Sequence, residues 1–306
     1  MHQRLTVLIP CRDERINIRA CIESVRPIAD EILVADSGST DGTLEIVASI
    51  EDCRLIEHEW NGYSAFKNWA IGEATHPWVL VVDADERVTP ELGGEIRSVL
   101  AEPGDDVDGY RIRHRTFFLG HEIKHSGRNT TSACRLFRRD VCRYKDVRVH
   151  EDIDLPSHRI RLLKQRFIHF EYRDYDHYFS KRLNYTKLGA RDRWEAGRRA
   201  GFFGLIVSPF LRFIQLYVFR LGFLDGLAGL QLCMLTAFIN SYVKQARLWE
   251  MEHLVEQEFL DLPSPAAKRN AAEPFRDAQT VAIPARVPGG AAIAGHSDES
   301  ELLRAA

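Results

Sequence analysis

Hydrophobic and polar positions along the first hundred residues predict an alternation of strands and helices. Short apolar runs indicate strands at 5–9, 31–35, 54–59 and 78–82. Apolar residues at helical spacing indicate helices between them, at 15–25, 43–50 and 64–74. A strand–helix order of this kind favours a right-handed, doubly wound α/β sheet whose first strands run parallel.

The fourth apolar run and the residues after it continue the same pattern. Residues 78–82 are apolar throughout, which is typical of a strand covered on both faces. A strong helix start comes next at Thr89-Pro90-Glu91, where a capping threonine precedes a proline and an acid. Further strand-like segments lie at 110–118, 134–138 and 162–170. We therefore predict a first domain over 1–170, built on a mixed sheet.

Residues beyond 170 are more helical, basic and apolar. The segment 158–220 holds fourteen Lys or Arg and five Asp or Glu. The run 226–243 has eighteen residues without a charge, the lower limit for crossing a membrane, but it contains Gln231 and Asn240. We expect a buried or interfacial helix here, within a membrane-associating or subunit-contacting region at 171–260. The tail at 261–306 is rich in Ala, Pro and Gly, which predicts disorder.

Composition excludes some classes of protein. The net charge of the 306-residue chain is only −3, which gives no case for a nucleic-acid binder. Its six cysteines form no CxxC pair, which favours reduced thiols. The chain runs directly from Met1 into an apolar strand, so we expect no signal peptide and a cytoplasmic location.

Carboxylates gather directly after three of the predicted strands. Asp83-Ala84-Asp85 comes after the fourth strand, 36–42 after the second and 11–14 after the first. Ligands bind at this edge of open α/β sheets, and Mg²⁺ commonly bridges carboxylates to a diphosphate. We expect Asp85 at a solvated rim, where a cation relieves the repulsion between acids. An acidic turn without a ligand, and helix capping by Thr40 or Asp41, are the alternatives.

The three segments, in this order and spacing, resemble glycosyltransferase family 2, the inverting enzymes of GT-A fold. Residues 8–14 are similar to the family's Pro-x-x-Asn-Glu strand end, with Asp13 in place of the usual Asn. Residues 36–42 match its Asp-x-Gly-Ser-Thr-Asp-Gly loop, and 83–85 its Asp-x-Asp. The resemblance covers residues 4 to about 155. It implies a GT-A fold, a Rossmann-like, doubly wound mixed sheet.

The resemblance implies a donor site and a metal site. Donor-binding roles fall on Pro10, Arg12, Glu14, Asp36, Lys67, Asp83 and Arg135. Asp36 would contact the base, typically uracil, and Lys67 would reach the diphosphate unless it is an exposed helix lysine. Asp85, with Asp83, would ligate a divalent metal, Mg²⁺ or Mn²⁺.

The general base implied by the resemblance lies in Val149-His150-Glu151-Asp152. Members with Glu-Asp at this point use the Asp, whereas a subgroup with Val-His-Glu favours the Glu, so Glu151 and Asp152 both stay open. A charged loop without a catalytic role is the alternative. Arg128 and Arg135 would offset charge on the leaving group.

The subgroup is that of lipopolysaccharide core β-glucosyltransferases, which the segment from Gly222 to Gly226 also resembles. This implies transfer of glucose from a UDP-sugar to a hydroxyl of a cell-envelope glycan or lipid-linked acceptor, such as lipopolysaccharide core. The enzyme would work at the inner face of the cytoplasmic membrane. A polyprenyl-phosphate glycosyltransferase and a non-catalytic nucleotide-sugar-binding protein are the alternatives.

Overall fold

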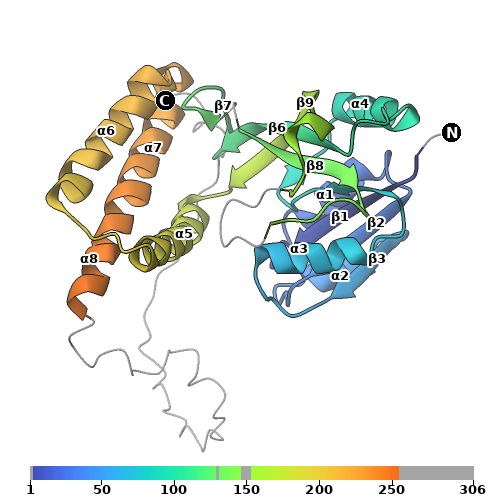
Figure 1. The fold of residues 1–306 in the computed structure, drawn as a ribbon, viewed down its shortest axis with the longest axis horizontal. Coiled ribbons are helices and arrows are strands. Elements are labelled where there is room, and N and C mark those ends of the chain that lie inside the picture. Colours follow the sequence, from blue (N-terminus) through green and yellow to red (C-terminus); the bar gives the residue numbers. More distant parts are fainter. Residues whose placement is uncertain (1–2, 129–130, 146–152, 255–306) are drawn as a thin grey trace, which may run out of the picture. The chain divides into compact units, whose positions relative to one another are not determined.

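The computed structural model describes residues 3–128, 131–145 and 153–254. Within these residues, one mixed sheet has the strand order β3-β2-β1-β4-β8-β6-β9-β5, and β7 pairs with β6 (Figure 1). The strands are β1 (Leu5–Cys11), β2 (Glu31–Asp36), β3 (Cys53–Glu57), β4 (Trp78–Val81), β5 (Glu86–Arg87), β6 (Gly109–Phe118), β7 (His121–Ile123), β8 (Ser132–Arg138) and β9 (Ile160–Tyr172). The predicted α/β fold with a mixed sheet is confirmed.

The first four strands run parallel and are covered by helices on both faces. These helices are α1 (Ile18–Val25), α2 (Thr43–Ala48), α3 (Tyr63–Gly72) and α4 (Pro90–Ala101). Alternate residues of β1 point to opposite faces: Val7 packs in the same cluster as Ile22 of α1, and Leu8 in the same cluster as Phe66 of α3. Burial on both faces explains why these strands are apolar throughout.

The other half of the sheet is mixed. Strand β8 runs antiparallel to β4 and β6, β9 runs parallel to β6, and β5 runs antiparallel to β9. The two-residue strand β5 was not predicted, because it exists only through its pairing with β9, where Glu86 lies opposite His169. This pairing brings the end of β9 to the residues that come after β4.

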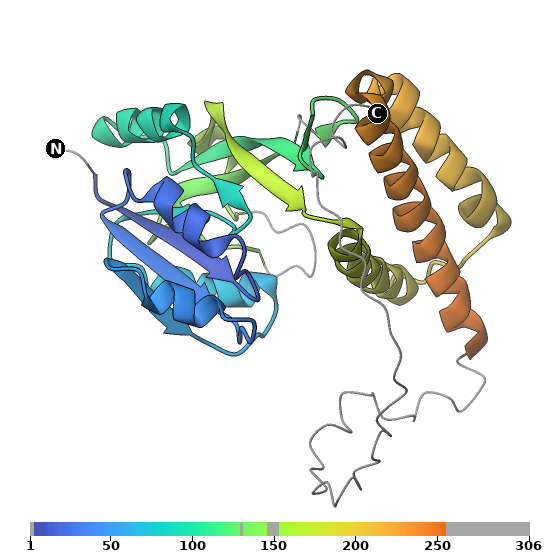
Figure 2. The same cartoon turned by 180° about the vertical axis from the view of Figure 1, so that it is seen from behind.

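Strand β9 leads directly into a helical region (Figure 2). Its helices are α5 (Tyr175–Glu195), α6 (Ser208–Ile214), α7 (Gly226–Ala237) and α8 (Lys244–Leu254). Shorter helical elements of this region are the π-helical segments η3 (Phe203–Val207), η4 (Gln215–Phe219) and η6 (Phe238–Val243) and the 3₁₀ segment η5 (Gly222–Asp225). Another 3₁₀ segment, η2 (Ser157–Arg159), precedes β9. A buried cluster joins Phe118 and Tyr172 of the sheet to Tyr178, Leu232 and Ile239 of the helices.

Asp225 ties the start of α7 to the loop after β7. Its buried carboxylate accepts hydrogen bonds from the backbone N–H groups of Lys124 and His125, and lies 3.0 Å from His125 Nδ1. The next residue, Gly226, has a φ of 63°, a conformation that glycine adopts without strain. The Gly-x-x-Asp-Gly segment therefore fixes the helices to the sheet.

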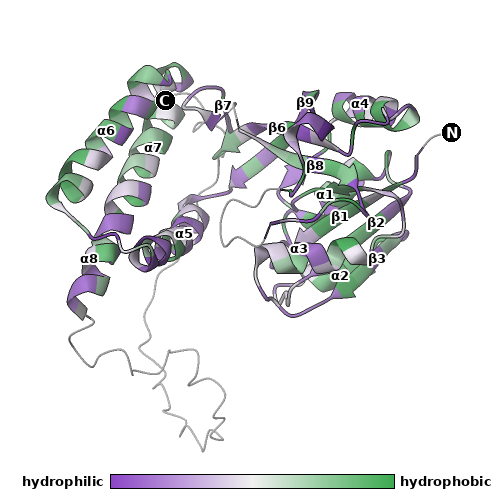
Figure 3. Ribbon diagram, viewed as in Figure 1, coloured by the Kyte–Doolittle hydropathy of each residue, from purple (hydrophilic) through white to green (hydrophobic). Residues whose placement is uncertain are grey.

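Hydrophobic residues, shown in green in Figure 3, make up much of α6 and α7. The stretch Gly222–His253 is long and apolar enough to cross a membrane by length and composition alone, a test that core helices also pass. The predicted boundary at 170 stays a prediction. The predicted disordered tail at 261–306 lies outside the described residues.

Candidate active site

The carboxyl ends of the parallel strands open into a cavity of about 1320 Å³. Seven of the residues predicted for the donor and metal sites line it: Pro10, Arg12, Glu14, Lys67, Asp83, Asp85 and Arg135. Asp36 does not line it, although its neighbour Ser37 does. Glu151 and Asp152, as well as His150, lie outside the described residues. The fold thus gathers side chains from the ends of β1 and β4, from the middle of β8 and from α3.

Asp83 is held by two cations. Arg135 Nη2 lies 2.6 Å from its Oδ2, and Lys67 Nζ lies 3.6 Å from its Oδ1. Burial opposes ionisation of Asp83, but the charge of Arg135 and then of Lys67 outweighs it and holds the pKa well below the usual range. The side chain of Lys67 is 13% exposed, so the exposed-lysine alternative is wrong.

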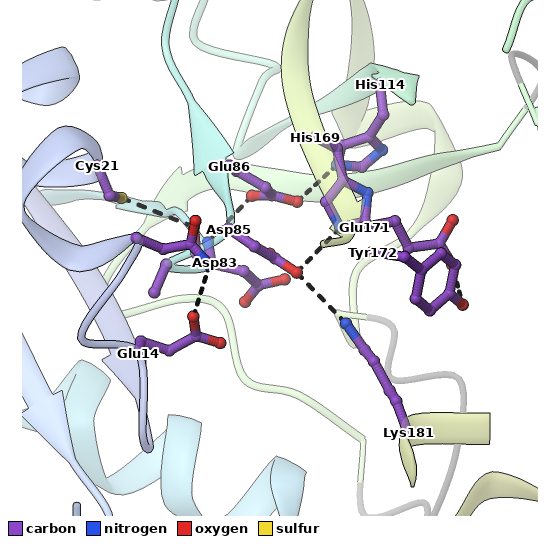
Figure 4. Close-up of polar contacts among 12 residues, drawn as sticks. Glu14, Cys21, Asp83, Asp85, Glu86, His114, His169, Glu171, Tyr172 and Lys181 are labelled. Carbon is purple, nitrogen blue, oxygen red and sulfur yellow. Dashed lines mark hydrogen bonds and ion pairs between the residues drawn. The ribbon is translucent and has the colours of Figure 1, made fainter. Parts of the chain in front are cut away.

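Asp85 is buried, which corrects the expectation of a solvated rim. It is 6% exposed because β5 pairs with β9, and the Phe170 N–H donates to the Asp85 carbonyl oxygen. His169 Nε2 and Lys181 Nζ each lie 3.3 Å from its Oδ2 (Figure 4). Burial alone would lower the pKa of His169, but the charge of Asp85 outweighs it and raises the pKa to about 9. Asp85 is therefore ionised at neutral pH, and so is its histidine partner.

Glu86 contacts both Asp83 and Arg135. Its Oε2 accepts a hydrogen bond from the Asp83 N–H, and its Oε1 lies 3.1 Å from Arg135 Nη2 and 2.8 Å from His114 Nε2. The side chain is fully buried. Glu86 thus positions both Asp83 and Arg135, a role that its place in the acidic run did not indicate.

The first and second loops are bound to each other. The Asp13 N–H donates to Ser39 Oγ, and the Thr40 N–H donates to Asp13 Oδ1. Asp13 has a φ of 55°, a left-handed conformation that Asp and Asn tolerate better than other residues with side chains. Asp13 can therefore take the place of the family's usual Asn at this position.

Asp36 is fully buried, and its carboxylate is hydrogen-bonded within the protein. Its carboxylate accepts hydrogen bonds from the N–H groups of Gly38 and Ser39 and from the hydroxyl of Ser39. These bonds shape the loop after β2. Its predicted contact with a nucleobase stays a prediction.

A second network of charges lies where β9 meets α5. Arg128 Nη1 lies 2.7 Å from Glu171 Oε2, and Arg182 Nη2 lies 3.0 Å from Glu171 Oε1. Burial opposes ionisation of Glu171, but Arg128 and Arg182 outweigh it and lower the pKa to about 2. Although Glu171 lines the cavity, its pKa is far too low for a general base near neutral pH.

Asn68 fixes Tyr144, which comes shortly before the segment that contains the predicted base. Its amide accepts from the Tyr144 N–H at 2.8 Å and donates to the Tyr144 carbonyl oxygen at 2.9 Å. Tyr144 forms an antiparallel bridge with Ile153, and it lines the cavity. Tyr144 and Ile153, which lie on either side of 146–152, are thus bridged to each other, and Tyr144 lies at the cavity wall. Lys67 and Asn68 are adjacent in the sequence, but a role was predicted for Lys67 alone.

The acidic residues offer oxygen ligands to a divalent cation. Both ion pairs of Asp85 use Oδ2, so Oδ1 has no partner in the described part of the chain. No group of three His, Cys, Asp or Glu among the described residues could hold a metal by itself. Mg²⁺ and Mn²⁺ are usually held by one or two carboxylates together with substrate phosphates.

Known proteins similar to this chain identify its family. The model of glycosyl transferase family 2 matches residues 6–150. The lipopolysaccharide core biosynthesis glycosyltransferase LpsC of Rhizobium meliloti is 32% identical over 263 residues, which cover 84% of this chain and 96% of that protein. The uncharacterized glycosyltransferase RT0209 of Rickettsia typhi is 25% identical over 259 residues, covering 81% and 88%. This chain therefore belongs to glycosyl transferase family 2, and the predicted family and GT-A fold are confirmed.

Solved structures are more distant. TarS of S. aureus is 17% identical with a TM-score of 0.42, covering 72% of this chain and 45% of that one. A glucosyl-3-phosphoglycerate synthase from Mycobacterium tuberculosis, solved with Mn²⁺, UDP-glucose and phosphoglyceric acid, is 21% identical with a TM-score of 0.31. It covers 37% of this chain and 44% of that one. Similarities of this size carry no argument about the activity.

Proposed function

We propose that this chain is a metal-assisted, inverting glycosyltransferase that moves a sugar, glucose as the first choice, from a UDP-sugar to an acceptor hydroxyl. The observation that carries the proposal is the pair Asp83 and Asp85 at the end of β4, in one cavity with Lys67 and Arg135. Carboxylates suit a metal, and the two cations suit a diphosphate. A divalent metal bound there would offset the charge of the departing nucleoside diphosphate.

The chain's own residues would do the remaining work. Lys67 and Arg135 would neutralise the diphosphate as it leaves, because both already lie beside Asp83 on the cavity wall. Glu171 is held ionised by two arginines, which makes it a weak base, so we place the role of base elsewhere. We assign that role to Glu151, with Asp152 as the alternative; attack from the face opposite the leaving group would invert the anomeric centre.

The acceptor that we propose is a lipid-linked or lipopolysaccharide core glycan. Support comes from the similarity over almost the whole length of LpsC, whose name assigns it to lipopolysaccharide core biosynthesis. Exposed aromatic and aliphatic side chains on the helices suit work at the inner surface of the cytoplasmic membrane. Phe202 and Phe219 are both 76% exposed and Leu227 is 70% exposed.

Calorimetric titration of UDP tests the donor and metal sites together. We expect binding in Mn²⁺ that weakens at least about tenfold, or about 1.4 kcal/mol, in EDTA or in Asp85→Asn. Asp140→Asn is the matched control, since Asp140 forms a surface pair with Arg139 outside the cavity. Equal binding by wild type and Asp85→Asn, with and without metal, would refute the metal assignment.

The same preparation tests the catalytic proposal. Glu151→Gln should bind UDP as the wild type does and lose sugar transfer, whereas a variant that loses UDP binding would count against a role as base. If wild-type protein binds the nucleotide but neither transfers nor hydrolyses UDP-glucose or another UDP-sugar with any acceptor fraction, the non-catalytic alternative is the better interpretation. A product that extracts into organic solvent with polyprenyl phosphate would favour the polyprenyl-phosphate alternative.

A further inference from the structure

The cavity has a second wall, made of helices. One face of α5 contributes Lys181, Tyr185, Leu188 and Asp192, spaced three or four residues apart. Asn240 and Lys244, also four residues apart, line the cavity from η6 and the start of α8. The helical region thus forms the wall of the cavity opposite the strand ends, in addition to exposing an apolar surface.

Nearly every lysine and arginine on the cavity walls pairs with a carboxylate. The pairs are Arg12 with Asp13, Lys67 and Arg135 with Asp83, Lys181 with Asp85, and Arg128 and Arg182 with Glu171. Lys244 differs, because no carboxylate in the described part of the chain forms an ion pair with it.

The surroundings of Lys244 are positive. Burial lowers the pKa of its half-buried ammonium group, and the nearby charges of Arg193 and Arg212 lower it further. Asp192 lines the same wall, yet the charged groups that act on Lys244 are these two arginines. A desolvated cation among like charges is unfavourable unless an anion compensates it.

A glycine makes room for this lysine. A Cβ atom at Gly189 would lie 3.1 Å from Lys244 Cδ, closer than side chains normally approach. Glycine inside a helix costs about 1 kcal/mol relative to alanine. Glycine at position 189 therefore leaves room for the stem of Lys244 to pack against α5, beside the cavity that both residues line.

Lys244 and the metal-ligand carboxylates lie at different parts of the cavity. Gly189 comes eight residues after Lys181, the partner of Asp85, which is about 12 Å along α5. Lys244 is thus placed away from the carboxylates that would hold the donor, in a part of the cavity that is left for an acceptor. Asn240 lies one helical turn away and can bind a sugar hydroxyl.

We propose that this helical wall is an anion subsite in which Lys244 binds a phosphate or carboxylate carried by the acceptor saccharide. The inference rests on the proposed function, because it assumes that the strand side of the cavity holds the donor. It adds a requirement on the substrate: the acceptor is an acidic sugar rather than a neutral one.

Binding of glucose 6-phosphate to the UDP–Mn²⁺ complex of the full chain tests this subsite. Saturating UDP first fills the donor site, so that the sugar phosphate reports on the helical wall. Lys244→Met keeps the stem and removes the charge, and should weaken binding at least about tenfold. Lys244→Arg should retain binding, as should Lys187→Met, since Lys187 is exposed on the same helix outside the cavity. Unphosphorylated glucose should bind at least about tenfold more weakly than glucose 6-phosphate.

The melting temperature of Lys244→Met distinguishes an anion-binding role of Lys244 from a structural one. Because its surroundings are positive, Lys244→Met should melt at the same temperature as the wild type or higher, while a structural lysine would lower it. Equal binding of glucose 6-phosphate by wild type and Lys244→Met would overturn the proposal. So would a loss of binding to phosphatidylglycerol vesicles with no loss for the sugar phosphate, which would assign the site to lipid headgroups. If UDP does not bind, the proposed function fails, and the same comparison without UDP still tests the anion subsite.

Discussion

Glu171 illustrates, at the scale of single residues, how charge is controlled in this protein. Its buried carboxylate lies between Arg128 and Arg182, and it accepts a hydrogen bond from the Tyr172 hydroxyl at 2.7 Å. The three partners come from the loop after β7, from α5 and from β9. Glu171 therefore joins the sheet to the helical region through charge, next to the cavity.

We expect this residue to make the protein sensitive to acid. The pKa of Glu171 falls from its ordinary value of 4.5 to about 2 on folding. Its contribution is therefore complete above about pH 4.5 and is lost as the pH falls toward 2, an effect of at most about 3 kcal/mol. Urea unfolding of wild type and Glu171→Gln between pH 3 and pH 7 measures it. The variant should be less stable at pH 7, by about 3 kcal/mol, with the difference shrinking toward pH 3.

The control for this prediction is Glu23→Gln, because Glu23 is exposed on α1. Its stability should track that of the wild type at every pH. If the curves of wild type and Glu171→Gln stay parallel from pH 7 to pH 3, the proposed ionisation of Glu171 is wrong.

At the scale of elements, η5 and α7 approach each other without room for a side chain. A Cβ atom on Gly229 would lie 2.1 Å from the carbonyl oxygen of Gly222, and one on Gly222 would lie 2.6 Å from Cys233 Sγ. This contact holds Asp225 against the loop that leads to Arg128. The packing of η5 against α7 thus helps to position Arg128, a charged residue of the cavity, through the loop that leads to it.

Gly229→Ala should therefore destabilise the protein by about 1–3 kcal/mol, because the added methyl group forces the two backbones apart. Gly94→Ala is the matched control, since Gly94 lies in α4 and a Cβ there meets nothing within 4 Å. That change should stabilise by up to about 1 kcal/mol, the difference in helix propensity. Chemical denaturation of both variants tests this, and a Gly229→Ala protein as stable as wild type would contradict the close packing.

On the scale of the whole molecule, the helical region has two different surfaces. One lines the cavity with Lys181, Asn240 and Lys244, and another exposes large apolar side chains such as Phe202 and Phe219. Exposed aromatic residues together with nearby basic residues favour attachment to an anionic bilayer. An acceptor held in that bilayer would reach the cavity from the helical side.

Sedimentation with vesicles of phosphatidylglycerol and phosphatidylcholine tests this attachment. The double variant Phe202→Ser, Phe219→Ser should bind about tenfold more weakly, because two large apolar side chains no longer enter the lipid. Ile16→Ser is the control, since Ile16 is 67% exposed but lies on the sheet side of the chain. Wild-type protein that stays in the supernatant would refute membrane attachment.

Much of the donor side of this protein could be predicted from the sequence alone. The strand–helix alternation, the cap at Thr89 and the acids at the end of β4 are local patterns, so the parallel sheet and its ligand-binding edge can be inferred from them. Parallel strands bring their carboxyl ends to one edge, which is why Pro10 and Asp83 could be grouped from sequence, whereas Lys67 of α3 was assigned to the same site only through the family resemblance.

Only the tertiary structure decided which charges meet. His169 and Lys181 pair with Asp85 across 84 and 96 residues of chain, and Asn68 binds Tyr144 across 76. No spacing in a sequence indicates such contacts, because they depend on β5 joining β9 and on α5 packing beside the strand ends. Burial also belongs to the fold: Asp85, expected at a solvated rim, is buried, and although burial raises the pKa of its carboxyl, the charges of His169 and Lys181 outweigh that effect and lower it.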